Sequence, residues 1–151
     1  MNAPASHAPP AFLQLERLVL SMPMAQTLGL KFTRIAPGDV EVEIPVLDAF
    51  TFRPGQLQAT PVFAIGDFAA VAAAGTTLPP DWINATVDVT LKLIAPAQGV
   101  ALRARGRVID AGKLLTVCAA DVYAVAQDGQ ETLCATLLGT ARNIDMNPRP
   151  R

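Results

Sequence analysis

One carboxylate, Asp67, lies in the middle of a run of apolar and small residues. The run over residues 62–74 reads VFAIGDFAAVAAA and is apolar on nearly every side, which predicts a buried helix. Burying an isolated carboxylate costs several kcal/mol unless the group is paired or protonated. An apolar setting also raises the pKa of a carboxyl group, which suits it to act as a general base or a nucleophile. Asp67 is therefore a candidate catalytic residue. The alternative is that it only hydrogen-bonds a backbone group or a partner chain and fixes a subunit interface.

The segment immediately before this helix can supply hydrogen-bond donors. The first turn of a helix carries unpaired backbone N–H groups and the positive end of the helix dipole. Such groups stabilise the oxyanion that develops when a carbonyl carbon is attacked, and they need no particular side chain. We therefore expect the backbone N–H groups of Ala59 and Thr60 to act as oxyanion donors, with Gly55 in the loop before them.

Two side chains of the same segment have competing interpretations. Gln58 cannot titrate, so it is either a donor to a substrate carbonyl or to a water, or simply a polar loop residue. Thr60 is favoured as the N-cap of the helix, with Pro61 at the first helical position, over a catalytic hydroxyl. Gly75 is expected to end the helix. About two helical turns separate Asp67 from the helix start, so the acid and the donors of one chain are expected to lie apart.

Hydrophobic patterns around this segment predict an α+β fold. Residues 12–22 have the spacing of an amphipathic helix that Pro23 ends, and residues 30–44 alternate as a hairpin with a turn at Pro37 and Gly38. After the central helix, an antiparallel meander of four strands is predicted over residues 84–94, 100–110, 113–125 and 131–144. A sheet must cover its apolar face, so we expect an antiparallel sheet wrapped around one long central helix, plus a short N-terminal helix.

The length and composition fit one soluble domain without a metal or nucleic-acid site. The 151 residues carry a net charge of −1, which gives no electrostatic footprint for nucleic acid or for an anionic membrane. The sole histidine, His7, has no clustered cysteines near it, so a zinc site is excluded. Both cysteines, Cys118 and Cys134, fall in strand patterns and are expected to be buried free thiols.

The ends of the chain show no targeting pattern. No basic flank is followed by an apolar stretch at the N-terminus, so a signal peptide is not expected. The longest apolar run is the central helix, which is too short to span a bilayer. We expect a cytoplasmic protein that needs no cofactor. One domain is expected over residues 11–145, with disordered tails over residues 1–10 and 146–151.

Three segments carry motifs that can be compared with a known family. Residues 55–60 read GQLQAT just before the helix that holds Asp67, and residues 86–97 read TVDVTLKLIAPA. The last two strands contain GRVIDAGKLLTVCAADVYA and ETLCATLLGTA. In this order they resemble the hotdog fold and, within it, acyl-CoA thioesterases similar to the phenylacetate-pathway thioesterases. That family has a G-x-x-H-G-G loop, then an acid, then strands of the forms T-x-E-L-x-I-x-F-x-x-P-A, G-x-V-x-x-x-G-[RK] and L-[VC]-A-x-A-x-G-T. The resemblance spans roughly residues 24–144.

The resemblance implies hydrolysis of an acyl-CoA thioester by a homodimer or a dimer-of-dimers tetramer. The site would lie at the subunit interface, so that Asp67 of one chain faces the loop of the other. The loop is degenerate, because Gln58 stands at the family's histidine and Ala59 and Thr60 stand at its two glycines. Thr86 corresponds to the start of the family's strand motif and is a candidate substrate-binding residue, or equally a polar residue at a strand edge.

Two functions of different classes remain open. The first is a thioesterase acting on a small or medium acyl group, apolar or aromatic, and the retained acid at Asp67 favours it. The alternative is a hotdog protein that binds acyl-CoA or a fatty acyl group without hydrolysing it, which the missing loop histidine and glycines favour. A dehydratase or isomerase of the same fold is less favoured, because related dehydratases pair a histidine with an acid and the domain has no histidine.

A stripe of basic residues lies on one face of a predicted strand. Arg103, Arg105 and Arg107 alternate along this strand, and Lys113 follows at the next turn. These groups could contact the phosphates of coenzyme A. The favoured interpretation is a solvated sheet face balanced by acidic residues, for which the candidates are Glu41, Glu43, Asp88 and Asp121.

Overall fold

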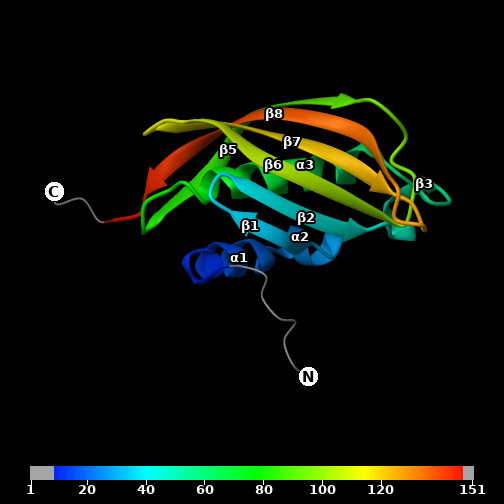
Figure 1. The fold of residues 1–151 in the computed structure, drawn as a ribbon, viewed down its shortest axis with the longest axis horizontal. Coiled ribbons are helices and arrows are strands. Elements are labelled where there is room, and N and C mark those ends of the chain that lie inside the picture. The colour runs from blue at the N-terminus through cyan, green and yellow to red at the C-terminus, as the bar shows by residue number, and fades with distance from the viewer. Residues whose placement is uncertain (1–8, 148–151) are drawn as a thin grey trace, which may run out of the picture.

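The computed structural model describes residues 9–147, in which one long helix is enclosed by a curved antiparallel sheet (Figure 1). Helix α3 (Ala59–Gly75) is buried because its residues are apolar or small on nearly every side. Six strands form the sheet in the spatial order β1-β2-β6-β7-β8-β5. Their bounds are Lys31–Ala36 for β1, Asp39–Pro45 for β2, Trp82–Leu93 for β5, Ala101–Ala111 for β6, Leu115–Val125 for β7 and Glu131–Asp145 for β8. The predicted α+β architecture, a sheet wrapped around one long helix, is confirmed.

Short elements precede the central helix. They are the 3-10 helices η1 (Pro10–Phe12) and η2 (Asp48–Phe50), the helices α1 (Leu13–Leu20) and α2 (Pro23–Leu28), and a hairpin of β3 (Thr51–Arg53) and β4 (Gln56–Leu57). The N-terminal helix is confirmed, but a second helix follows it, because Pro23 occupies the first position of α2, where a missing N–H costs nothing. Gly29 ends α2 with φ of +70°, a conformation that glycine adopts readily.

Strand β5 lies at the edge of the sheet, which differs from the predicted four-stranded meander. Only β6, β7 and β8 follow one another in space, and β5 pairs with β8. The connection after β5 runs past the start of α3, since Leu57 N–H donates to the carbonyl oxygen of Ala97 and Gly99 N–H donates to that of Gly55. This connection carries the chain from one edge of the sheet to β6, and it leaves β5 with one unpaired edge.

The helix and the sheet come into backbone contact at Gly106 of β6. A Cβ atom at this position would lie 2.0 Å from the carbonyl oxygen of Ala69 on α3. Only glycine permits this approach, because any side chain would overlap the helix backbone. Ala69 lies two residues after Asp67, so the contact sets the distance between helix and sheet at the level of the candidate acid.

The predicted chain ends lie largely outside the described residues. Residues 1–8, which include His7, and residues 148–151 lie outside the described residues. Within the described part, η1 begins at Pro10 and β8 ends at Asp145. None of the helices in residues 9–147 is both long enough and apolar enough to cross a membrane.

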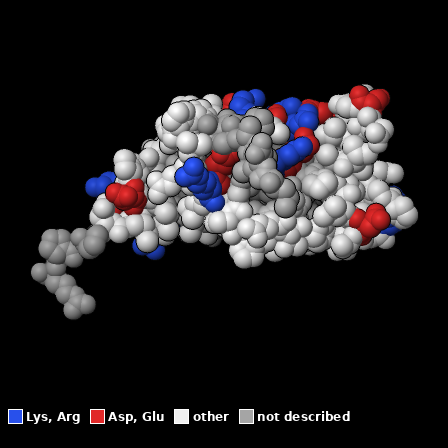
Figure 2. All heavy atoms as spheres, turned by 90° about the horizontal axis from the view of Figure 1, so that it is seen from below, with Lys and Arg blue, Asp and Glu red and all other residues white. Residues whose placement is uncertain are grey.

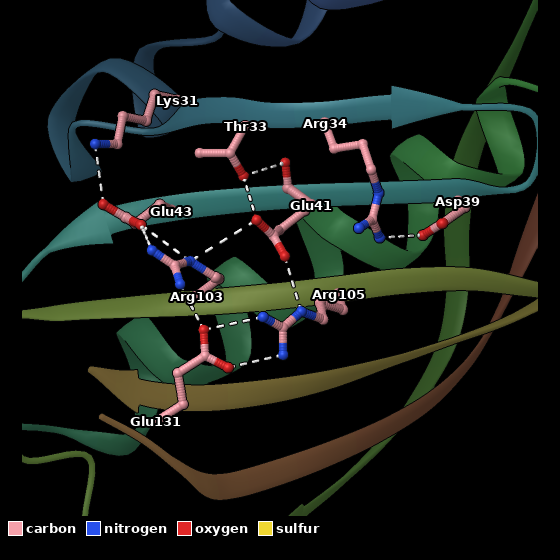
Figure 3. A network of polar contacts seen from close by, with 9 residues as sticks. All are labelled: Lys31, Thr33, Arg34, Asp39, Glu41, Glu43, Arg103, Arg105 and Glu131. Carbon is pink, nitrogen blue, oxygen red and sulfur yellow. Dashed lines mark hydrogen bonds and ion pairs between the residues drawn. The ribbon is translucent and has the colours of Figure 1, made fainter. Parts of the chain in front are cut away.

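The outer face of the sheet carries a network of ion pairs between strands (Figure 3). Arg103 bridges Glu43 and Glu131, and its neighbour on the same face, Arg105, bridges Glu41 and Glu131. The contacts include Arg103 Nη2 to Glu43 Oε2 at 2.7 Å and Arg105 Nε to Glu41 Oε2 at 2.8 Å. The guanidinium groups therefore join β6 to β2 on one side and to the start of β8 on the other.

The whole predicted stripe of arginines is engaged in this way. Arg107 Nη1 lies 3.0 Å from Asp121 Oδ2, so each of the three arginines has a carboxylate partner. The interpretation as a balanced sheet face fits this geometry, with Glu131 as an additional partner. Within residues 9–147, neither Asp88 nor Lys113 takes part in an ion pair.

The network lowers the pKa values of its carboxyl groups. Burial alone would raise the pKa of Glu41 above its ordinary value of 4.5, but hydrogen bonds from Thr33 and Arg105 outweigh burial and lower it. A hydrogen bond from Arg105 lowers the pKa of Glu131. These groups release their protons more readily in the folded chain. The stability that they add to the fold is therefore complete above about pH 4.5 and is lost as the pH falls through their pKa values in the folded chain.

We expect the Glu41→Gln variant to lose less thermal stability than the wild type on acidification. The wild-type melting temperature should fall between pH 5 and pH 3 as Glu41 takes up a proton, and the variant lacks this contribution. Thermal unfolding followed by circular dichroism across this range measures the difference. Asp48→Asn, a change at an exposed carboxylate, is the control and should follow the wild-type curve. Parallel curves for wild type and Glu41→Gln would contradict the prediction.

Candidate active site

Asp67 is half-buried on the side of α3 that faces β5. Thr86 Oγ1 on β5 donates a hydrogen bond to Asp67 Oδ1 over 3.0 Å. Burial raises the pKa of Asp67 above its ordinary value, and the hydrogen bond from Thr86 only partly offsets this effect. A carboxylate with a raised pKa accepts a proton more readily near neutral pH, which suits a general base.

A β-bulge in β5 brings Thr86 to the helix. The register pairs Thr86 with Ala141 and then Asp88 with Thr140, so Val87 has no partner on β8. In a regular strand, Thr86 and Asp88 would lie on the same face, because side chains alternate. The extra residue separates them: Thr86 pairs with Ala141 and reaches Asp67, whereas Asp88 pairs with Thr140 on the other face. The position of Thr86 beside the acid therefore depends on a local irregularity.

Helix α3 begins earlier than predicted. Ala59 is its first residue and Gln58 is the N-cap residue, so the prediction that Thr60 caps the helix is wrong. Thr60 and Pro61 instead follow Ala59 within the first turn. Proline is tolerated there because the first N–H groups of a helix have no intrahelical partner. No side chain caps the helix, which leaves the N–H groups of Ala59 and Thr60 as candidate donors.

The loop residues of the candidate site lie at the surface of the single chain. Gln58, Ala59 and Thr60 are exposed, and the backbone N–H of Gln58 donates to the carbonyl oxygen of Phe50 over 3.0 Å. Gly55 lies in the turn between β3 and β4 with φ of +72°, and no atom would contact a Cβ there within 4 Å. The loop therefore presents backbone groups and the Gln58 amide to whatever approaches from outside.

The two halves of the predicted site do not meet within one chain. Asp67 and Thr86 are in contact, but Ala59 lies eight residues before Asp67 on the helix. At 1.5 Å per residue this separation is about 12 Å along the axis. The expectation that the acid and the donors of one chain lie apart thus agrees with the geometry of α3.

Asp67 and Thr86 lie at the edge of a cavity of about 950 Å3. Its walls come from the apolar side of α1, from α3 beyond Asp67, from the α3–β5 connection and from the start of β5; examples are Leu15, Val71 and Trp82. Figure 2 shows the face that carries α1 and α2, with wide areas that have no charged side chain. The lining is mostly apolar with several polar side chains, among them Asp67, Asn84 and Thr86, which suits an apolar group that also makes polar contacts. The sequence predicted α1 from its amphipathic spacing, but no signal showed that Leu15 and Trp82 line a cavity.

The two thiols take no part in the chemistry of this site. Cys118 and Cys134 are buried and free, as predicted. Burial raises the pKa of both thiols to about 11, and the charge of Asp67 contributes for Cys118. At neutral pH both are therefore protonated and poor nucleophiles.

The chain is similar to solved structures of thioesterases. No family model and no curated protein matches it. A thioesterase family protein from Silicibacter pomeroyi is 30% identical in sequence with a TM-score of 0.84, and the alignment covers 89% of this chain and 98% of that one. The chain belongs to the thioesterase family. The resemblance to hotdog thioesterases that the sequence motifs indicated is thereby confirmed.

Two further structures show how far this thioesterase-family protein resembles the phenylacetate-related members. A phenylacetic acid degradation-related protein from Ralstonia eutropha is 26% identical with a TM-score of 0.71, covering 85% of this chain and 98% of that chain. The E. coli PaaI protein from the phenylacetic acid degradation operon is 18% identical with a TM-score of 0.75, covering 89% and 93%. At 18% identity the second likeness shows the shared fold alone.

Proposed function

We propose that this thioesterase-family protein hydrolyses a small or medium acyl-CoA thioester. The observation that carries the proposal is Asp67, a carboxylate with a raised pKa that Thr86 holds at the edge of a mostly apolar cavity. A thioester with an apolar or aromatic acyl group fits such a cavity, with its carbonyl carbon near the acid. The likeness to a phenylacetic acid degradation-related protein supports aromatic acyl groups among the candidates.

In this proposal Asp67 acts on water and the helix start acts on the carbonyl oxygen. Thr86 holds Oδ1, so Oδ2 takes a proton from water while the water oxygen attacks the thioester carbon. The backbone N–H groups of Ala59 and Thr60 of a partner subunit stabilise the oxyanion, and the Gln58 amide is a further donor. Collapse of the tetrahedral intermediate breaks the C–S bond and releases the thiolate of CoA, which takes up the proton that Asp67 holds. Direct attack by Asp67, through an anhydride that water cleaves, gives the same products.

A homodimer would bring the donors to the acid. Strand β5 has an unpaired edge, and apolar side chains beside it are exposed: Val87 by 55%, Leu93 by 57% and Phe63 of α3 by 40%. An unpaired strand edge next to an exposed apolar strip is a surface that a second copy of the chain can cover. We therefore propose a dimer that meets along β5, with a tetramer of two such dimers as a larger assembly.

We expect Leu93→Arg to yield a monomer with at least about 100-fold lower kcat, because each site would lose its oxyanion donors. Light scattering at micromolar protein concentration measures the mass, and release of CoA measures the activity. Leu114→Arg is the matched control, since Leu114 is 70% exposed at the turn between β6 and β7. Its mass and activity should equal those of the wild type. A monomeric wild-type protein with full activity would contradict the shared site.

The second candidate function is binding of an acyl-CoA or fatty acyl group without hydrolysis. Gln58 favours it, because an amide at this exposed loop position cannot transfer a proton between water and substrate. In this case Asp67 and Thr86 would bind the thioester or only join β5 to α3.

A panel of acyl-CoA thioesters distinguishes the two functions. Purified protein is mixed with acetyl-, butyryl-, octanoyl-, phenylacetyl- and palmitoyl-CoA, and the released thiol is measured. We expect kcat/KM of about 10⁴ M⁻¹s⁻¹ or more for at least one small or medium thioester. Saturable binding of one thioester without release of thiol from any of them would contradict hydrolysis and support the binding function.

A further inference from the structure

Arg53 lies at the end of the molecule where α3 begins. It is the last residue of β3, and the β3–β4 hairpin leads directly into the helix (Figure 1). Five residues lie between Arg53 and Ala59, and the chain reverses between them at the turn that contains Gly55. The register of the hairpin pairs Arg53 with Gln56, which lies three residues before Ala59, so the guanidinium group stays near the proposed oxyanion donors.

Two contacts orient this guanidinium group. Arg53 Nε donates to Gln56 Oε1 over 2.6 Å, and the buried Gln56 side chain fixes the acceptor. The guanidinium carbon also lies 5.4 Å from the centroid of the Phe52 ring. Both terminal nitrogens, Nη1 and Nη2, are left without a partner in the described part of the chain. An oriented arginine with a free fork of donors matches the geometry of a phosphate group.

The other arginines with fixed positions cannot serve this purpose. Arg103, Arg105 and Arg107 hold carboxylates on the outer face of the sheet, and Arg34 holds Asp39. Of the remaining cations without a carboxylate partner in residues 9–147, Lys113 lies at the turn between β6 and β7, near the opposite end of the sheet. Arg53 therefore combines a free fork, a fixed orientation and closeness to the start of α3, which the carboxylate-bound arginines and Lys113 do not.

We propose that Arg53 binds a phosphate group on the carrier of the thioester, and this inference rests on the proposed function. The acyl group and its carbonyl would lie between Asp67 of one chain and the start of α3 of its partner, and the pantetheine arm would lead outward past the β3–β4 hairpin of that partner. A phosphate on that arm then accepts two hydrogen bonds from Nη1 and Nη2. Arg53 is a binding residue for the carrier and takes no part in breaking the C–S bond.

Two carriers share this chemistry. Coenzyme A has a diphosphate and a 3′-phosphate, and the phosphopantetheine group of a carrier protein has one phosphate next to the same arm. Pantetheine itself has no phosphate. Comparison of CoA, dephospho-CoA, 4′-phosphopantetheine and pantetheine therefore reports whether a phosphate is bound and which one.

The test is calorimetric binding of these four compounds to the full-length wild type, Arg53→Gln and Lys113→Gln. We expect Arg53→Gln to weaken binding of CoA about tenfold or more and to leave pantetheine binding unchanged. Lys113→Gln removes the same charge elsewhere and should change neither affinity by more than about twofold. Melting temperatures within a few degrees of the wild type show that Arg53→Gln is folded. Binding needs no turnover, so failure of hydrolysis and failure of this proposal are separate results.

Each result has a distinct meaning. An equal loss for CoA, dephospho-CoA and 4′-phosphopantetheine supports the proposal and assigns the phosphate next to the pantetheine arm, which both carriers have. A loss for CoA alone supports it and assigns the 3′-phosphate, and thus free coenzyme A. Three results would overturn the proposal. Arg53→Gln could weaken binding of pantetheine as much as that of CoA, Lys113→Gln could weaken CoA binding as much as Arg53→Gln does, or the wild type could fail to bind CoA.

Discussion

Asp67→Asn is expected to lower kcat/KM by about 10³-fold or more and to raise the melting temperature at neutral pH. The loss follows because an amide cannot take a proton from water or attack a carbonyl carbon, and a general base contributes about 10²–10⁴-fold. An asparagine has nearly the same shape and can still accept the hydrogen bond from Thr86, so the site geometry should persist. Release of CoA under single-turnover and steady-state conditions measures the loss.

The gain in stability follows from the direction of the pKa shift. Burial raises the pKa of Asp67 above 3.8, so the folded chain binds this proton more tightly than the unfolded chain does. The ionised group therefore destabilises the fold progressively as the pH rises through its folded pKa, and the penalty is complete above it. Asparagine lacks this penalty. The melting temperature of the variant should exceed that of the wild type at pH 8, and the difference should vanish below about pH 4.

Asp88→Asn provides the matched control for both effects. Asp88 lies on β5 close to Thr86 in sequence, but the bulge leaves it exposed and away from the helix. Its replacement should alter neither kcat/KM nor the pH dependence of the melting temperature. If Asp67→Asn retained a tenth or more of the wild-type activity, Asp67 would not be the base. If Asp67→Asn were less stable than the wild type at pH 8, the Asp67 carboxylate would serve the fold or the subunit interface.

The sequence was informative wherever a local pattern determines the structure. A charge within an otherwise apolar helix made Asp67 the candidate acid, because few arrangements tolerate an unpaired buried carboxylate. Alternation of apolar residues predicted the strands to within a few residues, and the turn at Gly38 joins β1 to β2 as expected. The buried thiols of Cys118 and Cys134 followed from the same strand patterns.

Features that depend on contacts far apart in the sequence could not be read in this way. The bulge at Val87 interrupts no alternation that the sequence shows, yet it decides on which face Thr86 lies. The edge position of β5 follows from where the connection after it passes the start of α3, and no local residue preference determines that path. The start of α3 at Ala59 was missed because Thr60 and Pro61 form a convincing cap signal, whereas the preceding hairpin determines where the helix begins.

Gly106→Ala is expected to destabilise the protein by about 3 kcal/mol or more, because the methyl group would meet helix backbone. The Cβ would lie 2.0 Å from the carbonyl oxygen of Ala69, and 2.8 Å from the backbone nitrogen of Ala70. Backbone atoms in the middle of a buried helix cannot rotate away as the end of a flexible side chain can. Either α3 or β6 must move, and both lie in the centre of the fold. Urea unfolding followed by circular dichroism measures the loss.

Gly139→Ala separates this contact from the general cost of replacing glycine in a strand. Its nearest atom, the carbonyl oxygen of Asp88, lies 3.2 Å from the added Cβ, so a shift of a few tenths of an ångström is enough. Its effect on the free energy of unfolding should be within about 1 kcal/mol of zero. Similar effects of the two substitutions would contradict a specific contact at Gly106.

The Gly106→Ala substitution also links the fold to the chemistry. Ala69 follows Asp67 by two residues, so a helix displaced by Gly106→Ala moves the carboxylate away from Thr86 on β5. A shift of about 1 Å at a catalytic group can lower a rate about 100-fold. We therefore expect the folded fraction of Gly106→Ala, selected by size exclusion at low temperature, to show reduced kcat for the most reactive thioester. Full activity per folded molecule would show that the helix position at Gly106 does not determine the geometry of Asp67.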